Sequence, residues 1–152
     1  RPETGNHILI GSEDPECDER IFVDPDNWDQ NFSEQWKTQV LRQAQRYPKL
    51  PISSDVKGVV SLYDVSDDWI PIYDKSDLPG FYMAIGTSGN QYKNAPVAGV
   101  LMTELIEYCE NGNDHDKNPL SINLKYINRD IGLKFYSRNR KINKESSMSV
   151  LG

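Results

Sequence analysis

The order of three segments in the middle of the chain most constrains its fold: an apolar strand, a glycine-containing loop and a helix. Residues 81–85 (Phe-Tyr-Met-Ala-Ile) are apolar on both faces, which is typical of a strand in the middle of a sheet. The loop 86–93 follows, and apolar residues then recur at intervals of three and four over 94–110. Pro96 is compatible with the first turn of a helix. The sequence therefore predicts a buried strand that leads through this loop into a helix at about 94–110.

A second helix is predicted at about 33–47, because Ser33 can cap it, its apolar residues form one stripe, and Pro48 ends it. The β-branched and aromatic residues elsewhere favour short strands. Asp67 and Asp68 are interpreted as formers of a turn that joins two of these strands. The expected strands cover residues 7–10, 21–23, 56–65, 69–73, 122–127 and 131–136. We therefore expect an α+β fold with a mainly antiparallel sheet and two principal helices.

Charge is unevenly distributed along the chain. Residues 1–116 contain 9 basic and 21 acidic residues, whereas residues 117–152 contain 8 basic and 2 acidic residues. The basic residues of the tail are interrupted by apolar ones, which favours a tail packed on an acidic body over a nucleic-acid-binding arm. We expect one domain, residues 1–116, with the basic tail 117–152 packed on the same domain, and no nucleic-acid partner.

Other classes of protein are disfavoured by what the sequence lacks. No apolar run approaches the ~20 residues of a membrane-spanning helix, so no membrane span is expected. Cys17 and Cys109 provide neither a disulfide framework nor a pair with zinc-site spacing, which favours an intracellular, cytoplasmic protein. The acidic stretch 24–29 has Trp28 and Asp29 where a calcium-binding loop needs an oxygen ligand and glycine, so no metal site is expected.

The loop before the second helix has the chemistry of an anion-binding segment. Backbone N–H groups are unpaired at a helix start, where the helix dipole is positive. Gly86 and Gly89 permit close approach of a ligand to the backbone, and Lys93 adds a positive charge. Further donors and acceptors come from Thr87, Ser88, Asn90 and Gln91. The loop matches neither the phosphate-loop nor the dinucleotide-binding pattern, and a turn that merely caps the helix is the alternative.

Several motifs occur in a fixed order along the chain. They are Arg1-Pro2-Glu3 leading to Ile10-Gly11, Tyr47-Pro48, the segment 58–63, Asp67 to Ile72, the Gly86-Thr87-Ser88-Gly89 loop, Ala95-Pro96 and Gly99. Together they resemble the C-terminal half of the D-amino-acid-oxidase-like FAD-dependent oxidoreductases, which include glycine oxidase and sarcosine oxidase. The resemblance covers about residues 1–110.

The resemblance implies a function for the loop. Gly86, Thr87, Ser88, Gly89, Asn90 and Gln91 would face the flavin of FAD, and Lys93 would bind the carboxylate of an amino-acid substrate. The reaction would be hydride transfer from the C–N bond of an amino acid or related amine to the flavin. Members of the family often have His-Gly where this chain has Asn90-Gln91, and no acid–base pair is apparent in the sequence, so no catalytic residue is assigned.

The sequence contains no Gly-x-Gly-x-x-Gly segment, which the family uses to bind the adenosine and pyrophosphate of FAD. We therefore expect an incomplete substrate-binding and flavin-facing domain, a fragment of a larger flavoenzyme. Its partner would be the missing N-terminal FAD-binding segment of the same polypeptide, and this chain alone would neither retain FAD nor be active. The alternative is a non-enzymatic α+β protein-interaction module with an acidic body and a basic tail.

Overall fold

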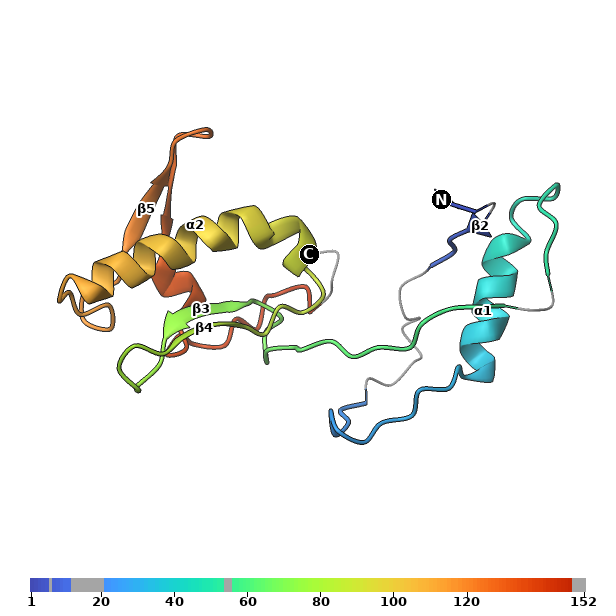
Figure 1. Ribbon diagram of the computed structural model, residues 1–152, viewed down its shortest axis with the longest axis horizontal. Coiled ribbons are helices and arrows are strands. Elements are labelled where there is room, and N and C mark those ends of the chain that lie inside the picture. Colours follow the sequence, from blue (N-terminus) through green and yellow to red (C-terminus); the bar gives the residue numbers. More distant parts are fainter. Residues whose placement is uncertain (6, 12–20, 54–55, 149–152) are drawn as a thin grey trace. The chain divides into compact units, whose positions relative to one another are not determined.

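The computed structural model describes residues 1–5, 7–11, 21–53 and 56–148. The chain forms two compact units, Arg1–Leu62 and Tyr63–Gly152, which are described separately (Figure 1). Helices and antiparallel strands occur together in the chain, which confirms the predicted α+β class. The division into a domain of residues 1–116 and a tail of residues 117–152 stays a prediction. No helix in the described ranges combines the length and apolar character needed to cross a membrane.

The first unit contains a two-stranded antiparallel ladder and one helix. β1 (Pro2–Glu3) pairs with β2 (His7–Ile8), and α1 spans Glu34–Ala44. The hydroxyl of Ser33 accepts the backbone N–H of Trp36 at 3.0 Å, so Ser33 caps α1 as predicted. The helix predicted at 33–47 is confirmed, and its last residues form a turn instead of a further helical turn. Ala44 is the one buried apolar residue among those described in this unit.

Two predicted strands of the N-terminal half are absent from the described part of the structure. Residues 21–23 and the described residues of 56–65 form no strand, and residues 12–20, including Cys17, lie outside the described residues. The hairpin predicted between 56–65 and 69–73 is therefore wrong. Strand propensity depends on a neighbouring strand, and in the structure Val59 is 87% exposed with no such neighbour among the described residues.

The second unit is built on a different hairpin. β3 (Ile72–Lys75) pairs antiparallel with β4 (Tyr82–Ile85), and Tyr73 lies opposite Ala84. The sheet has two strands in the described part of the chain, and Ile85 is 47% exposed. The prediction that 81–85 lies in the middle of a sheet is therefore wrong. One edge of β4 has no partner strand here, although its residues are as apolar as those of a central strand.

Helix α2 (Gln91–Glu110) packs along this hairpin (Figure 1). It confirms the helix predicted at 94–110 and begins three residues earlier, so that Pro96 lies inside it. The core of the unit combines α2 with β3 and the C-terminal segment. Its buried residues are Tyr73, Ala98, Leu101, Leu105 and Leu133. This core fixes the position of the loop between β4 and α2.

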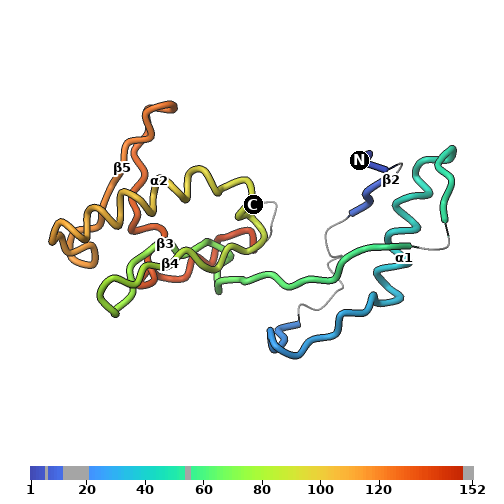
Figure 2. The backbone as a smooth tube through the Cα atoms, viewed as in Figure 1, coloured from blue at the N-terminus to red at the C-terminus, as the bar shows by residue number. Residues whose placement is uncertain are grey.

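The C-terminal segment forms a second hairpin and a short helix. β5 (Ser121–Leu124) pairs with β6 (Arg129–Gly132), and this hairpin projects beyond α2 (Figure 2). The strands predicted at 122–127 and 131–136 are thus shorter and shifted. Residues Leu133–Tyr136 form the 3-10 helix η1, because Leu133 turns inward to complete the core.

Candidate functional site

The loop between β4 and α2 has a left-handed backbone. Gly86, Ser88 and Gly89 have φ angles of +63°, +50° and +78°. A Cβ atom on Gly86 would lie 3.1 Å from Cβ of Ser66, so a side chain is disfavoured there by both φ and space. Ser88 is fully buried and its hydroxyl donates to the carbonyl of Gly86 at 3.1 Å. The loop is therefore held in one defined conformation, as expected of a segment with a fixed role.

The first part of the loop is bound to Asp64. The backbone N–H of Thr87 donates to Oδ2 of Asp64 at 3.0 Å, and the hydroxyl of Thr87 donates to Oδ1. The backbone N–H of Ser88 donates to the carbonyl of Asp64 at 3.0 Å. Although partial burial raises the pKa of Asp64, hydrogen bonds from Thr87 and from Gly86 lower it below its ordinary value. An internal carboxylate thus occupies loop N–H groups that the sequence predicted to be open to a ligand.

The start of α2 keeps the capacity to bind an anion or a polar edge. Its first turn contains no acidic residue, and Asn90 at the N-cap makes no side-chain capping bond. Oδ1 of Asn90 and Oε1 of Gln91 are buried and have no hydrogen-bond partner in the described residues. Lys93 is exposed in the same first turn. Buried polar atoms are normally paired, so these two oxygens indicate a position for a ligand group that donates hydrogen bonds, while the Nδ2 atom of Asn90 already donates to the carbonyl of Ser88 at 3.5 Å.

A pocket of about 270 Å³ opens beside this helix start. Asn90 and Asn94 of α2 line it together with aromatic side chains from β3, from the segment before β3 and from η1. These aromatic residues are Trp69, Tyr73, Phe135 and Tyr136. The hydroxyl of Tyr73 is buried and has no hydrogen-bond partner among the described residues. The pocket therefore presents flat apolar walls with a few polar groups, as is typical of sites for small ring-containing ligands.

The structure places the predicted site residues in three neighbouring positions. Asn90 lines the pocket, whereas Gly86, Thr87, Ser88 and Gly89 lie in the preceding loop. Gln91 and Lys93 belong to the first turn of α2 but do not line the pocket. The predicted contacts of these residues with flavin and substrate stay predictions.

Sequence reasoning missed the residues that hold the C-terminal segment against the pocket. Asp68 is buried and accepts two hydrogen bonds from Arg140, 72 positions later, at 2.6 and 3.1 Å. The hydrogen bonds from Arg140 hold the pKa of Asp68 well below its usual range, against the opposing effect of burial. The acidic body and the basic tail of the sequence indicate that ion pairs can form between them, but they do not identify Asp68 and Arg140 as partners.

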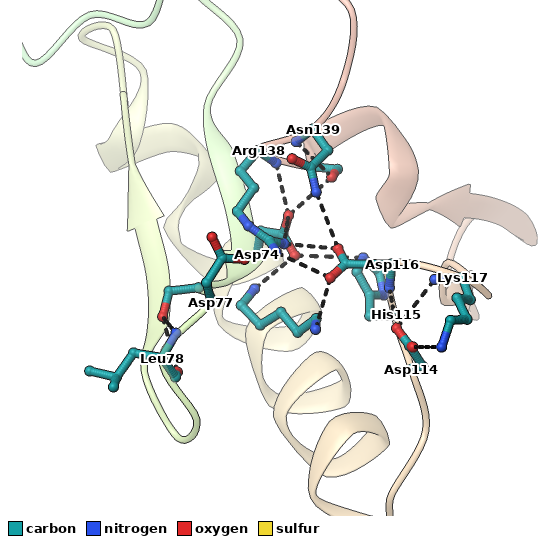
Figure 3. Close-up of polar contacts among 12 residues, drawn as sticks. Asp74, Asp77, Leu78, Asp114, His115, Asp116, Lys117, Arg138 and Asn139 are labelled. Carbon is teal, nitrogen blue, oxygen red and sulfur yellow. Dashed lines mark hydrogen bonds and ion pairs between the residues drawn. The ribbon is translucent and has the colours of Figure 1, made fainter.

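A second buried pair lies nearby (Figure 3). Asp74 is fully buried and accepts the backbone N–H of Arg138 at 2.8 Å and its guanidinium at 3.2 Å. The same guanidinium contacts Asp116 at 2.9 Å and Asp77 at 2.6 Å. In the described ranges, no group of three or more His, Cys, Asp or Glu side chains is arranged to hold a metal ion.

Comparison with known proteins gives a match for most of the chain. The model of the DAO family, described as FAD dependent oxidoreductase, matches residues 1–105. No curated protein and no solved structure matches significantly. The matched range includes α1, the β3–β4 hairpin, the loop 86–90 and most of α2. The chain is thus a member of the DAO family of FAD-dependent oxidoreductases.

Proposed function

We propose that this chain forms the flavin-facing and substrate-binding part of an enzyme that oxidises the C–N bond of an amino acid or related amine. The observation that carries the proposal is the start of α2. There, the buried side-chain oxygens of Asn90 and Gln91 have no hydrogen-bond partner in the described residues, the first helical turn contains no acidic residue, and Asn90 lines an aromatic pocket. FAD-dependent chemistry is a property of the family, whereas the class of substrate is the proposal.

The residues at the start of α2 fit the polar edge of a flavin ring. That edge alternates C=O and N–H groups, and a side-chain amide can either donate to the first or accept from the second. Asn90 and Gln91 would hold this edge, and the positive end of α2 would stabilise the negative charge that gathers there. Bound FAD would supply the hydride acceptor for the reaction.

Lys93 is proposed to bind the carboxylate of the substrate. It lies in the first turn of α2, at the positive end of the helix dipole, so both charges favour an anionic group. An ammonium point charge binds a carboxylate without strict geometry, which suits an exposed position. A second part of the polypeptide, carrying the nucleotide-binding segment, is proposed as the partner of this chain. The cytoplasmic location also stays a prediction.

The first test is a visible absorption spectrum of the purified full-length protein, followed by a screen of amines and amino acids for loss of flavin absorbance. We expect bound flavin and bleaching by at least one amino acid under anaerobic conditions. The 152-residue chain, purified in parallel, is expected to contain no FAD. A full-length protein without flavin, or flavin that no amine reduces, would contradict the proposal.

The second test separates binding from catalysis at Lys93. In Lys93→Met we expect the KM for an amino acid to rise by about 10- to 100-fold, because a charge-assisted hydrogen bond of about 1.5–3 kcal/mol is lost. The flavin spectrum should be unchanged. Lys125→Met, at an exposed position in the β5–β6 turn, is the matched control and should leave KM unchanged. Equal KM values for both variants would remove Lys93 from the site.

A further inference from the structure

The pocket beside Asn90 is lined by α2, by Tyr73 and by two further walls that are far apart in the sequence. Trp69, Ile70 and Pro71 form one wall in the segment before β3. The second wall comes from the C-terminal segment, with Phe135 and Tyr136 of η1 and the later pair Ser146 and Ser147. This second wall lies beyond the residues that the family model matches, which end at 105. The width of the pocket therefore depends on how a segment outside the family match is attached to one inside it.

Arg140 makes this attachment. Its Nη2 atom donates to the carbonyl of Ile70 at 2.6 Å, and Ile70 itself lines the pocket. Its Nη1 atom donates to the carbonyl of Ser137 at 3.1 Å. Ser137 is the residue that follows Tyr136 of the second wall. The same guanidinium binds both carboxylate oxygens of Asp68, the neighbour of Trp69. The side chain of Arg140 thus joins the backbone of the first wall, at Ile70, to the backbone next to the second wall, at Ser137.

Asp68 completes the attachment. Its Oδ2 atom also accepts the backbone N–H of Asn143 at 3.2 Å, which fixes the C-terminal segment a few residues before Ser146. Its Oδ1 atom accepts the backbone N–H of Ile70 at 3.2 Å. Asp68 is 1% exposed, so the pair is shielded from water and keeps one geometry.

We propose that Arg140 is a positioning residue that sets the width of the pocket by fastening the segment 135–147 to the segment 68–71 through Asp68. The role in ligand binding rests on the proposed function of the pocket, whereas the fastening itself does not. The planar guanidinium makes hydrogen bonds in several fixed directions at once, which a lysine ammonium cannot reproduce. Arg140 acts on a ligand only through the aromatic walls that it holds.

Arg138 provides a matched control. It also fastens the C-terminal segment to β3, through the fully buried Asp74 (Figure 3). None of its side-chain partners Asp74, Asp77 and Asp116 lines the pocket. Loss of Arg138 should therefore weaken the fold without changing the width of the pocket.

The first test uses the fluorescence of Trp69 and requires no FAD. In the 152-residue chain with Trp28→Phe and Trp36→Phe, Trp69 is the sole tryptophan. Acrylamide, a small neutral amide, quenches the emission of Trp69 in proportion to the access that it has to the indole ring. We expect quenching to increase in Arg140→Gln and in Asp68→Asn, and to be unchanged in Arg138→Gln. Equal quenching in Arg140→Gln and the parent chain, with both folded by circular dichroism, overturns the proposal.

Conservative variants keep the test decisive if Arg140→Gln does not fold. Arg140→Lys and Arg138→Lys retain the charge and remove the planar hydrogen-bonding group. The proposal expects more quenching in Arg140→Lys than in Arg138→Lys at similar melting temperatures. The double variant Asp68→Asn with Arg140→Gln pairs two neutral amides and should restore part of the protection. The same quenching in both lysine variants overturns the proposal.

The second test uses the full-length flavoprotein and the amine identified in the bleaching screen. Since Arg140 holds walls that contact the ligand and does not touch the reacting atoms, we expect Arg140→Lys to raise KM on the order of tenfold, about 1.4 kcal/mol of binding free energy, with a smaller change in kcat. Arg138→Lys should change neither. If acrylamide quenching differs between the Arg140 and Arg138 variants while the full-length protein, with or without substitutions, binds no flavin, the positioning role of Arg140 holds and the proposed function fails. An unchanged KM in Arg140→Lys overturns the ligand-binding part of the inference.

Discussion

The two units of this chain bury their apolar side chains to very different extents. In the second unit, residues from α2, β3 and η1 form a closed core, and Leu101, Leu105 and Leu133 are fully buried. In the described part of the first unit only Ala44 is buried, while Phe22 is 85% exposed. Burial of apolar surface is the main favourable term in folding. The second unit therefore has its own source of stability, and the first unit lacks a comparable one among its described residues.

The ion pairs of the two units also differ in burial, and again the second unit has the more buried groups. In the second unit, Asp68 and Asp74 are buried and each binds an arginine of the C-terminal segment. In the first unit, the ion pairs of the described residues, such as Lys37 with Glu34, are exposed. Exposed pairs contribute little to stability, whereas breaking a buried pair is strongly destabilising. The comparison predicts that substitutions in the second unit will have much larger effects.

The largest effect is expected for Asp74→Ala. The substitution leaves the guanidinium of Arg138 without its buried partner and removes the acceptor of its backbone N–H. We expect the free energy of unfolding of the second unit to fall by about 3–5 kcal/mol. Urea unfolding followed by circular dichroism measures this change. A loss as small as that of an exposed ion pair would show that the pair is not buried in solution.

A somewhat smaller effect is expected for Leu105→Ala. Leu105 of α2 is fully buried in the core of the second unit. Its truncation should lower the free energy of unfolding by about 3 kcal/mol, because apolar burial is lost and a cavity is left behind. Val59→Ala, at an exposed position in the first unit, is the control and should change stability by less than about 0.5 kcal/mol. Similar losses for both variants would remove the contrast between the units.

A local effect is expected for Ser33→Ala in the first unit. The hydroxyl of Ser33 caps α1 by accepting the N–H of Trp36, and its loss should weaken the helix by about 1 kcal/mol. Amide hydrogen exchange should therefore become faster in α1 and remain unchanged in α2. Parallel acceleration in both helices would show that the two units unfold together.

The mildest effect is expected from pH. His115 is buried and its Nδ1 atom accepts the N–H of Leu120 at 3.2 Å, which requires the neutral ring. Burial lowers the pKa of His115, with a smaller opposing effect of Asp74. The unfolded state therefore binds more protons, so the stability of the second unit should decline as pH falls below about 6.5. Thermal unfolding between pH 7 and 5 measures this, and His115→Gln should remove that part of the decline.

The sequence was sufficient for features that depend on local interactions. The helix at α1 followed from Ser33, its apolar stripe and Pro48, and α2 followed from its apolar spacing. The structure begins α2 at Gln91, three residues before the position predicted from Pro96 as a first-turn proline. In the structure Pro96 is the sixth residue of α2 and lies beyond the first turn, so its position gives only an approximate boundary.

Features that depend on distant partners could not be predicted. Val59 and Val60 favour a strand, yet no strand lies beside them in the described residues, so hairpin formation shifted to β3 and β4. The pairing of Asp68 with Arg140 joins residues 72 positions apart, and Asp68 alone indicated only a turn. At the candidate site, the loop 86–91 was identified from sequence. The carboxylate of Asp64 that occupies part of it and the aromatic pocket were not.

The most direct test of the central claim is amide hydrogen exchange of the full-length protein with and without FAD. We expect FAD to slow exchange in residues 89–93, where α2 begins, and to leave the β5–β6 hairpin at 121–132 unchanged. Thr87 and Ser88 should be protected in both states, because their N–H groups already donate to Asp64. Strong protection elsewhere on binding FAD, with no change in residues 89–93, would contradict the claim that this helix start faces the flavin.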